Sequence, residues 1–260
     1  MATLQPGSGG NRFHPSRLRS MTPVASSVEI SAVLPAFNEA ANLEQSVGRM
    51  ARALETHARA FEIIVVDDGS QDGTAGVLDR LKTAHPSLRV VRHPVNRGYG
   101  AALRSGFDAA RLPWIFLMDA DNQFDPMELG LLLARAGEGD IVTGYRQRRR
   151  DPLPRRLNAW AFFSLVRLFF GRLARDVNCA FKLIRRDLLD RMSLHSEGAL
   201  INTEMLVLAR QLQARVVEVA VHHYPRRSGK QTGANPRVVL RAFRELLAFK
   251  AEMRKVEKAA

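Results

Sequence analysis

Two carboxylates two positions apart follow an apolar run near the middle of the sequence. Asp119 and Asp121 come directly after the run 114–118 (WIFLM), and Gln123 adds an amide oxygen two residues later. Hard oxygen ligands of this kind suit Mg²⁺ or Mn²⁺, and phosphate oxygens of a substrate and water complete the coordination shell. The spacing therefore predicts a divalent metal site made by Asp119, Asp121 and Gln123.

Two further polar clusters follow earlier apolar runs. Residues 35–39 (PAFNE) end the first run, and residues 67–70 (DDGS) end the second. Asp67 and Asp68 can accept hydrogen bonds from a nucleobase or from ribose hydroxyls, although this cluster is also an ordinary turn and helix cap. Because ligands bind at the carboxyl ends of parallel strands, we expect all three clusters to form one ligand site.

The spacing of the apolar residues predicts the elements that hold these clusters. Strands are expected at 28–34, 61–66, 88–92 and 114–118, and helices at 39–57, 72–84 and 98–110. This alternation predicts an α/β fold with a doubly wound, mostly parallel sheet covered by helices on both faces. Glycines 98, 100 and 106 do not follow the first strand, which excludes a P-loop enzyme and a nicotinamide dehydrogenase.

Composition and charge narrow the class of protein. The 260 residues suit one large domain, and the single cysteine, Cys179, excludes an internal disulfide and a cysteine metal cluster. Residues 1–140 carry 14 basic and 16 acidic side chains, whereas residues 141–260 carry 25 and 10, so the net charge of +13 comes from the second half. A basic block of this size predicts an anionic partner: nucleic acid, anionic lipid or a phosphorylated substrate.

Four segments in this order resemble glycosyltransferase family 2, and in particular its dolichyl- and polyprenyl-phosphate sugar synthases. They are LPAFNE (34–39), VVDDGSQDGT (65–74), NRGYGAALRSG (96–106) and MDADNQFDP (118–126), and the resemblance extends over about residues 28–235. It implies a GT-A fold with a Rossmann-like mixed sheet, a UDP- or GDP-sugar donor, and transfer with inversion through an oxocarbenium-like transition state.

The resemblance also implies roles for individual residues. Mg²⁺ or Mn²⁺ on Asp119 and Asp121, with Gln123 beside them, would neutralise the leaving nucleoside diphosphate. The expected donor-binding set is Pro35, Phe37, Glu39, Asp67, Asp68, Arg97, Gly98, Arg104, Asp119, Ala120 and Asp121.

The arginines Arg146, Arg156 (or its neighbour Arg155) and Arg226 match positions that gather on phosphate groups in the family. Guanidinium groups suit this role because they bind phosphate oxygens in pairs. Segment 176–189 departs from the family pattern, since Ala180 stands where glycine is usual and Lys182 where arginine is usual.

Three hypotheses for the function remain, and the first two differ in the acceptor. A polyprenyl phosphate is already an anion and needs no general base, whereas a hydroxyl-bearing lipid or glycan needs one, for which Glu204 is the candidate. A non-catalytic RNA- or membrane-binding protein is the third hypothesis. The intact metal motif argues against it, and the aromatic residues of the basic half are not interleaved with basic ones as nucleic-acid stacking requires, so no nucleic-acid partner is expected.

The second half also contains amphipathic segments. The apolar stretch 158–173 is too short and too charged to span a bilayer, so helix 156–174 is predicted to lie on an anionic membrane surface, with a buried core helix as the alternative. The expected organisation is a disordered tail (1–26), a glycosyltransferase domain (27–235) with donor (27–126) and acceptor (127–235) halves, and a basic helix (236–260). We expect peripheral association with the cytoplasmic face of the cell membrane.

Overall fold

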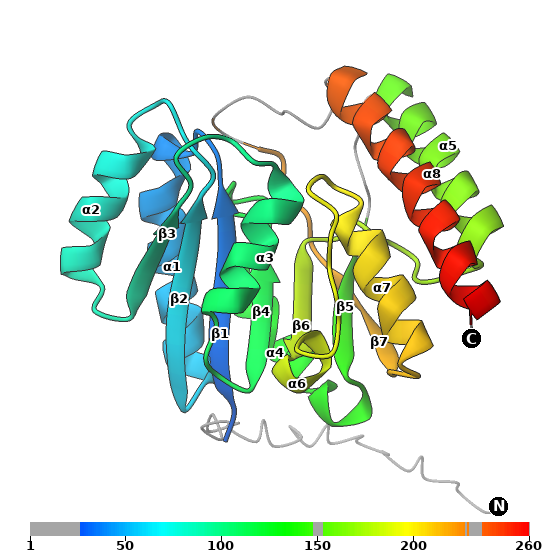
Figure 1. The fold of residues 1–260 in the computed structure, drawn as a ribbon. Coiled ribbons are helices and arrows are strands. Elements are labelled where there is room, and N and C mark those ends of the chain that lie inside the picture. The colour runs from blue at the N-terminus through cyan, green and yellow to red at the C-terminus, as the bar shows by residue number, and fades with distance from the viewer. Residues whose placement is uncertain (1–26, 148–152, 227, 229–235, 260) are drawn as a thin grey trace, which may run out of the picture.

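The computed structural model describes residues 27–147, 153–226, 228 and 236–259. Within them, seven strands form one sheet in the order β3-β2-β1-β4-β6-β5-β7 (Figure 1). The strands are β1 (Glu29–Ala36), β2 (Ala60–Asp67), β3 (Leu88–Arg92), β4 (Trp114–Met118), β5 (Ile141–Arg146), β6 (Phe181–Arg185) and β7 (Val216–Val221). Only β6 runs antiparallel to its neighbours among these strands, so the predicted mixed, mostly parallel sheet is confirmed.

Helices cover both faces of the sheet. The helices are α1 (Ala40–His57), α2 (Thr74–Ala84), α3 (Tyr99–Ala109), α4 (Leu129–Leu133), α5 (Leu153–Phe170), α6 (Arg186–Leu189), α7 (Ile201–Gln211) and α8 (Pro236–Ala259), and 3₁₀ turns span Pro126–Glu128 and Ala136–Glu138. Apolar residues of α1, α2 and α4 pack on one face, and those of α3, α6 and α7 pack on the other.

Each strand of the first half packs against the helices on both faces of the sheet, because successive side chains point to opposite faces. In β2, Ile63 and Val65 pack toward α1, whereas Ile64 and Val66 pack toward α3. This two-sided burial explains the continuous apolar runs seen in the sequence.

The direction of the strands decides which segments meet. Strands β1, β2, β4, β5 and β7 all run the same way, so their carboxyl ends lie at one edge of the sheet. Strand β6 runs the opposite way and therefore begins at that edge. The three polar clusters, the end of β5, the turn before β6 and the segment after β7 are thus brought together, as the sequence predicts for the clusters.

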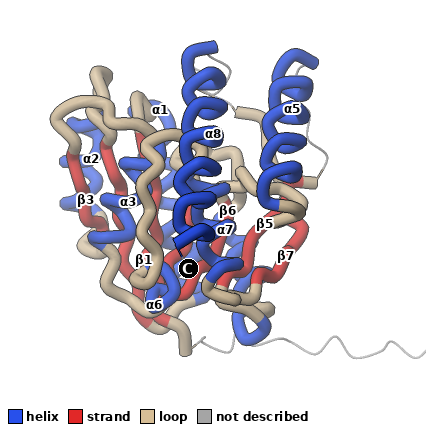
Figure 2. The backbone as a smooth tube through the Cα atoms, turned by 45° about the vertical axis from the view of Figure 1, so that its right-hand side comes forward, coloured by secondary structure: helices blue, strands red, loops and turns tan. Residues whose placement is uncertain are grey.

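Helices α5 and α8 pack against each other and against α7 at the far end of the sheet from α2 (Figures 1 and 2). Phe162, Val166 and Phe170 of α5 are buried against residues of α7 and α8, including Val207 and Phe249. The aromatic face that we predicted to lie on a membrane is therefore core, and only the opposite face of α5 meets solvent. Within the described residues, no helix has the length and apolarity needed to cross a bilayer.

Candidate active site

The paired carboxylates lie at the carboxyl end of β4. Asp119 Oδ1 accepts a hydrogen bond from the Tyr99 hydroxyl at 3.1 Å, and Asp121 Oδ1 accepts one from the backbone N–H of Gln123 at 3.1 Å. Burial and the negative charge of Asp121 raise the pKa of Asp119 to about 7, against the lowering effect of the Tyr99 hydrogen bond. Two carboxylates that share a site in this way are stabilised by a bound cation.

The donor set fits a metal that is also held by a substrate. No group of three or more His, Cys, Asp or Glu side chains able to hold a metal occurs among the described residues. Mg²⁺ is typically bound through one or two carboxylates, with phosphate oxygens and water supplying the other ligands. Asp119 and Asp121 match that pattern.

Gln123 has a second task besides its predicted one. Its side-chain Nε2 donates to the carbonyl oxygen of Tyr224 at 3.1 Å, and its own carbonyl accepts from the Tyr224 N–H at 2.8 Å. Gln123 thus fixes the segment after β7 beside the paired carboxylates. Its role as a metal ligand remains a prediction.

The first cluster supplies a second acid to the site. Pro35 is buried in β1, Phe37 is half-buried in the loop that follows, and Glu39 is buried at the start of α1. The Glu39 carboxylate accepts hydrogen bonds from Asn42 Nδ2 at 2.6 Å and from Arg226 Nη2 at 2.5 Å. Burial raises the pKa of Glu39, and these two hydrogen bonds oppose the shift.

The carboxylates of the second cluster are both engaged by the backbone. Asp67 Oδ1 accepts from the Ser70 N–H at 3.0 Å, which closes the turn. Asp68 is bonded to His93 Nδ1 at 2.6 Å and accepts the N–H groups of Arg97 at 2.9 Å and Gly98 at 2.8 Å. Asp68 therefore shapes the loop that leads into α3.

That loop requires glycine at its last position. Gly98 has φ +102°, and a Cβ there would lie 2.6 Å from the carbonyl oxygen of Glu197. The conformation directs Tyr99 toward Asp119. Arg97 is exposed, and Arg104 Nη1 donates to the carbonyl oxygens of Leu194 (3.2 Å) and His195 (2.6 Å), so the predicted donor contacts of these two arginines remain predictions.

Two of the predicted phosphate-binding arginines reach the same edge. Arg146, at the end of β5, bonds Asp176 through Nε (2.6 Å) and Nη2 (2.8 Å). Arg226, in the segment after β7, bonds Glu39 and lies 3.6 Å from Asp121 Oδ2 through Nη1. The side chain of Arg156 lies outside the described residues.

Glu204 is fully buried in α7. Its two oxygens accept the backbone N–H groups of His195 at 2.7 Å and Ser196 at 2.8 Å. The carboxylate therefore orders the loop before α7, and its role as a general base remains a prediction.

Comparison with known proteins agrees with this geometry. Residues 31–193 match the family described as "Glycosyl transferase family 2". This chain belongs to glycosyltransferase family 2. It is 36% identical to glycosyltransferase AglD of Haloferax volcanii over 222 residues, which are 82% of this chain and 36% of that protein. It is 32% identical over 213 residues to the undecaprenyl-phosphate 4-deoxy-4-formamido-L-arabinose transferase of Enterobacter sp. (strain 638), covering 81% of this chain and 64% of that protein. The chain thus spans less than two thirds of the length of either relative.

Solved structures support the GT-A fold of this family 2 chain. Glucosyl-3-phosphoglycerate synthase from Mycobacterium tuberculosis, in complex with Mn²⁺, UDP-glucose and phosphoglyceric acid, has a TM-score of 0.68 at 21% identity, over 86% of this chain and 80% of that one. Mannosyl-3-phosphoglycerate synthase from Rubrobacter xylanophilus has a TM-score of 0.66 at 22% identity, over 84% of this chain and 73% of that one.

Some residues of this family 2 site were not singled out from the sequence. Tyr99 and Asn202 contact each other beside Asp119, and His93 bonds Asp68. Of these three residues, Tyr99 is the one that the sequence could most readily have indicated, because it follows the glycine that ends the loop and begins a predicted helix. The positions of Asn202 and His93 depend on tertiary packing, for which the sequence gives no local signal.

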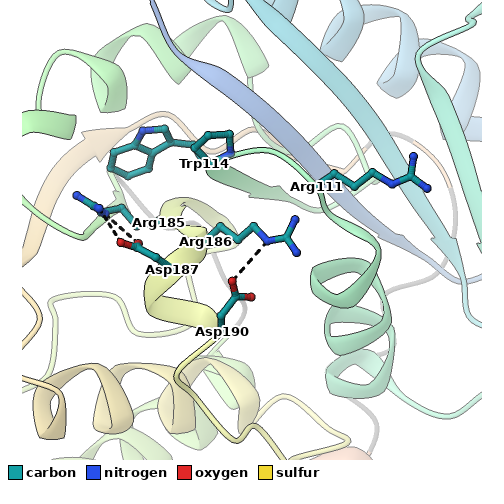
Figure 3. Close-up of a pocket in the computed structure, with 7 residues that line it drawn as sticks. Arg111, Trp114, Arg185, Arg186, Asp187 and Asp190 are labelled. Atoms are coloured by element: carbon teal, nitrogen blue, oxygen red, sulfur yellow. Dashed lines mark hydrogen bonds and ion pairs between the residues drawn. The ribbon is translucent and has the colours of Figure 1, made fainter.

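A concavity of about 460 Å³ lies at the opposite edge of the sheet, at the beginning of β4 and the end of β6 (Figure 3). Two of the arginines that line it pair with neighbouring acids: Arg185 with Asp187 at 2.6 Å, and Arg186 with Asp190 at 3.6 Å. It shares none of the predicted site residues.

Proposed function

We propose that this chain is a metal-dependent inverting glycosyltransferase that moves a sugar from a UDP- or GDP-sugar to a membrane lipid, namely a polyprenyl phosphate. The observation that carries the proposal is the meeting of paired carboxylates, Asp119 and Asp121, with the guanidinium groups of Arg146 and Arg226 at one edge of the sheet. One relative is named for transfer to undecaprenyl phosphate, and one structural neighbour holds Mn²⁺ and UDP-glucose.

Asp119 and Asp121, with Gln123 nearby, are the residues that would hold Mg²⁺ or Mn²⁺. The metal, when bound, supplies positive charge against the charge that develops on the leaving nucleoside diphosphate. Tyr99 keeps the first carboxylate oriented through its hydrogen bond.

The donor is bound by the two clusters next to the metal motif. Glu39 and Asp68 are the acids that face its nucleoside, with Pro35 and Phe37 lining the same loop and Asp67 holding the turn. Arg97, Gly98 and Arg104 belong to the loop and helix beside it, and Ala120, whose side chain is buried in the core, lies between the two carboxylates.

The acceptor phosphate is bound by Arg146, Arg156 and Arg226. Asp176 holds the Arg146 fork, and Glu39 holds Arg226, so both guanidinium groups are already oriented by buried acids. A phosphate oxygen is a nucleophile without deprotonation, so the engaged state of Glu204 favours this acceptor over a hydroxyl compound.

The membrane surface is met by the outward faces of α5 and α8. Trp160 and Leu168 of α5 are 68% and 74% exposed, and Leu240 and Leu247 of α8 are 62% and 56% exposed. The same two helices also carry exposed arginines, namely Arg167, Arg244 and Arg254. Apolar side chains together with arginines suit peripheral binding to anionic lipid. In this proposal residues 27–126 bind the donor, residues 127–235 the acceptor, and α8 the cytoplasmic membrane face.

The experiment that tests the proposal is nucleotide release from a panel of UDP- and GDP-sugars with Mn²⁺ or Mg²⁺, with and without a short-chain polyprenyl phosphate. We expect release that requires both metal and lipid phosphate and yields a glycolipid. Donor hydrolysis that does not respond to lipid phosphate would refute the phosphate acceptor, and no release with any donor would refute the enzyme.

A further inference from the structure

A buried ammonium group lies behind the candidate site. Lys182 of β6 is fully shielded from solvent, and its Nζ donates to the carbonyl oxygens of Val177 (3.1 Å) and Cys179 and to Asn202 Oδ1 (3.2 Å). All three acceptors are neutral, and Lys182 forms no direct ion pair with a carboxylate in the described part of the chain. Such a buried charge is costly, which indicates that it serves neighbouring charges.

The neighbouring charges include two acids of the site and one arginine. Burial lowers the pKa of Lys182 and the positive charge of Arg146 adds to that shift, whereas the negative charges of Asp176 and Asp119 oppose it. The antiparallel register pairs Lys182 with Leu117, two residues before Asp119, and places its side chain on the face covered by α3 and α7. Lys182 therefore lies on the strand next to β4, near the end of β4 that leads to Asp119.

Hydrogen bonds connect Lys182 to the surroundings of both Asp119 and Asp176. Asn202, its side-chain partner, also bonds Tyr99, whose hydroxyl donates to Asp119. The two carbonyls that Lys182 holds belong to the turn that follows Asp176, the acid that grips Arg146.

We propose that Lys182 is the internal counter-cation of the site, a positioning residue that offsets Asp119 and Asp176 so that a nucleoside diphosphate and a second phosphate can bind among them. The inference rests on the proposed function for its substrates, and Lys182 itself contacts neither of them. The family resemblance makes arginine the usual residue at this position, and arginine carries the same positive charge as Lys182.

The first test measures anion binding without metal. Isothermal titration in EDTA with UDP, GDP and inorganic pyrophosphate compares the wild-type chain with Lys182→Met, which keeps the apolar stem, and with Lys182→Arg, which keeps the charge. We expect Lys182→Met to weaken binding about tenfold or more, since one nearby charge is removed from a site of low dielectric. Lys182→Arg should stay within about threefold of wild type, and Lys82→Met, at an exposed lysine of α2, should not differ.

Melting temperatures measured on the same samples separate this role from a structural one. A lysine that only fills space would make the larger arginine as harmful as methionine. Asn202→Asp is a second variant, because it sets a carboxylate against the ammonium and cancels the charge without removing the lysine. It should weaken anion binding as Lys182→Met does, and it decides the question if Lys182→Met does not fold.

The proposal is overturned if folded Lys182→Met binds all three anions within about twofold of wild type, or if folded Lys182→Arg loses as much affinity as Lys182→Met. A wild-type chain that binds none of the three anions also overturns it. A wild-type chain that binds them but transfers no sugar refutes the proposed function alone.

Discussion

The two halves of the molecule position their functional side chains by different means. In the half that ends at residue 126, the acids Asp67 and Asp68 are held by backbone N–H groups close to the strand ends. In the second half, the guanidinium groups of Arg146 and Arg226 are held by buried acids, one of which comes from 187 residues away in the sequence. The first half therefore holds these acids mainly with backbone N–H groups, and the second half holds its arginines with ion pairs.

This difference indicates where each half is vulnerable. A carboxylate held mainly by backbone N–H groups depends little on any one partner side chain for its place. An arginine held by a partner carboxylate is coupled to that partner, and its loss alters both groups.

The largest expected effect belongs to the metal motif of the first half. Asp121→Asn removes one of two carboxylates and should lower kcat at least about 1000-fold, because the charge of the leaving diphosphate would no longer be neutralised. Steady-state nucleotide release with saturating Mn²⁺ measures the effect. Asp79→Asn, at an exposed acid of α2, is the matched control and should keep wild-type turnover. An Asp121→Asn chain with more than a tenth of wild-type kcat would contradict the metal site.

The next largest effect is expected from a substitution that breaks an ion pair of the second half. Arg226→Gln should reduce kcat/KM for the lipid phosphate about 100-fold, since a charged hydrogen-bond donor is removed. It should also raise the pKa of Glu39 further, because the charge and hydrogen bond of Arg226 lower that pKa, so the acid limb of the pH-rate profile moves to higher pH. A variant that loses activity equally at every pH would argue against the Glu39 coupling.

Arg92→Gln serves as the comparison for Arg226→Gln. Arg92 pairs with Asp79 at 2.6 Å, but both side chains are exposed, and pairs of that kind contribute about 1 kcal/mol or less. Activity and stability should change little. An equal loss in both variants would remove the distinction between a buried pair at the site and a pair on the surface.

The sequence predicts the elements that have a local signal better than those that depend on tertiary packing. The strands 88–92 and 114–118 match β3 and β4 at both ends, because each is a short run that is rich in β-formers and is bounded by polar or turn residues. The short antiparallel β6 and the packing of α5 on α7 and α8 have no such local signature. Phe162 and Phe170 look like a membrane-binding face in the sequence, and only tertiary packing shows that they are core. The backbone partners of Glu204 are likewise set by tertiary packing, and its role as a general base remains a prediction.

A smaller effect is expected at the outward face of α5. Trp160→Ser combined with Leu168→Ser should weaken binding to anionic phosphatidylglycerol vesicles about tenfold, because two exposed apolar side chains would no longer enter the lipid. Vesicle sedimentation measures the partition. Leu131→Ser, at an exposed leucine of α4, is the control and should bind as wild type does. Equal binding by all three proteins would exclude this face as the lipid contact.

The smallest effect on catalysis, and the one that separates the acceptors most sharply, is expected at Glu204. In Glu204→Gln an amide NH₂ faces one of two backbone N–H groups, so the free energy of unfolding should fall by about 1–3 kcal/mol. Transfer to polyprenyl phosphate by the folded protein should stay within about threefold of wild type, because that acceptor needs no base. Thermal unfolding and turnover per folded molecule are measured together. A kcat loss above about 100-fold with unchanged stability would make Glu204 a general base and the acceptor a hydroxyl compound, and the second half of the site would then contain the group that takes the reacting proton.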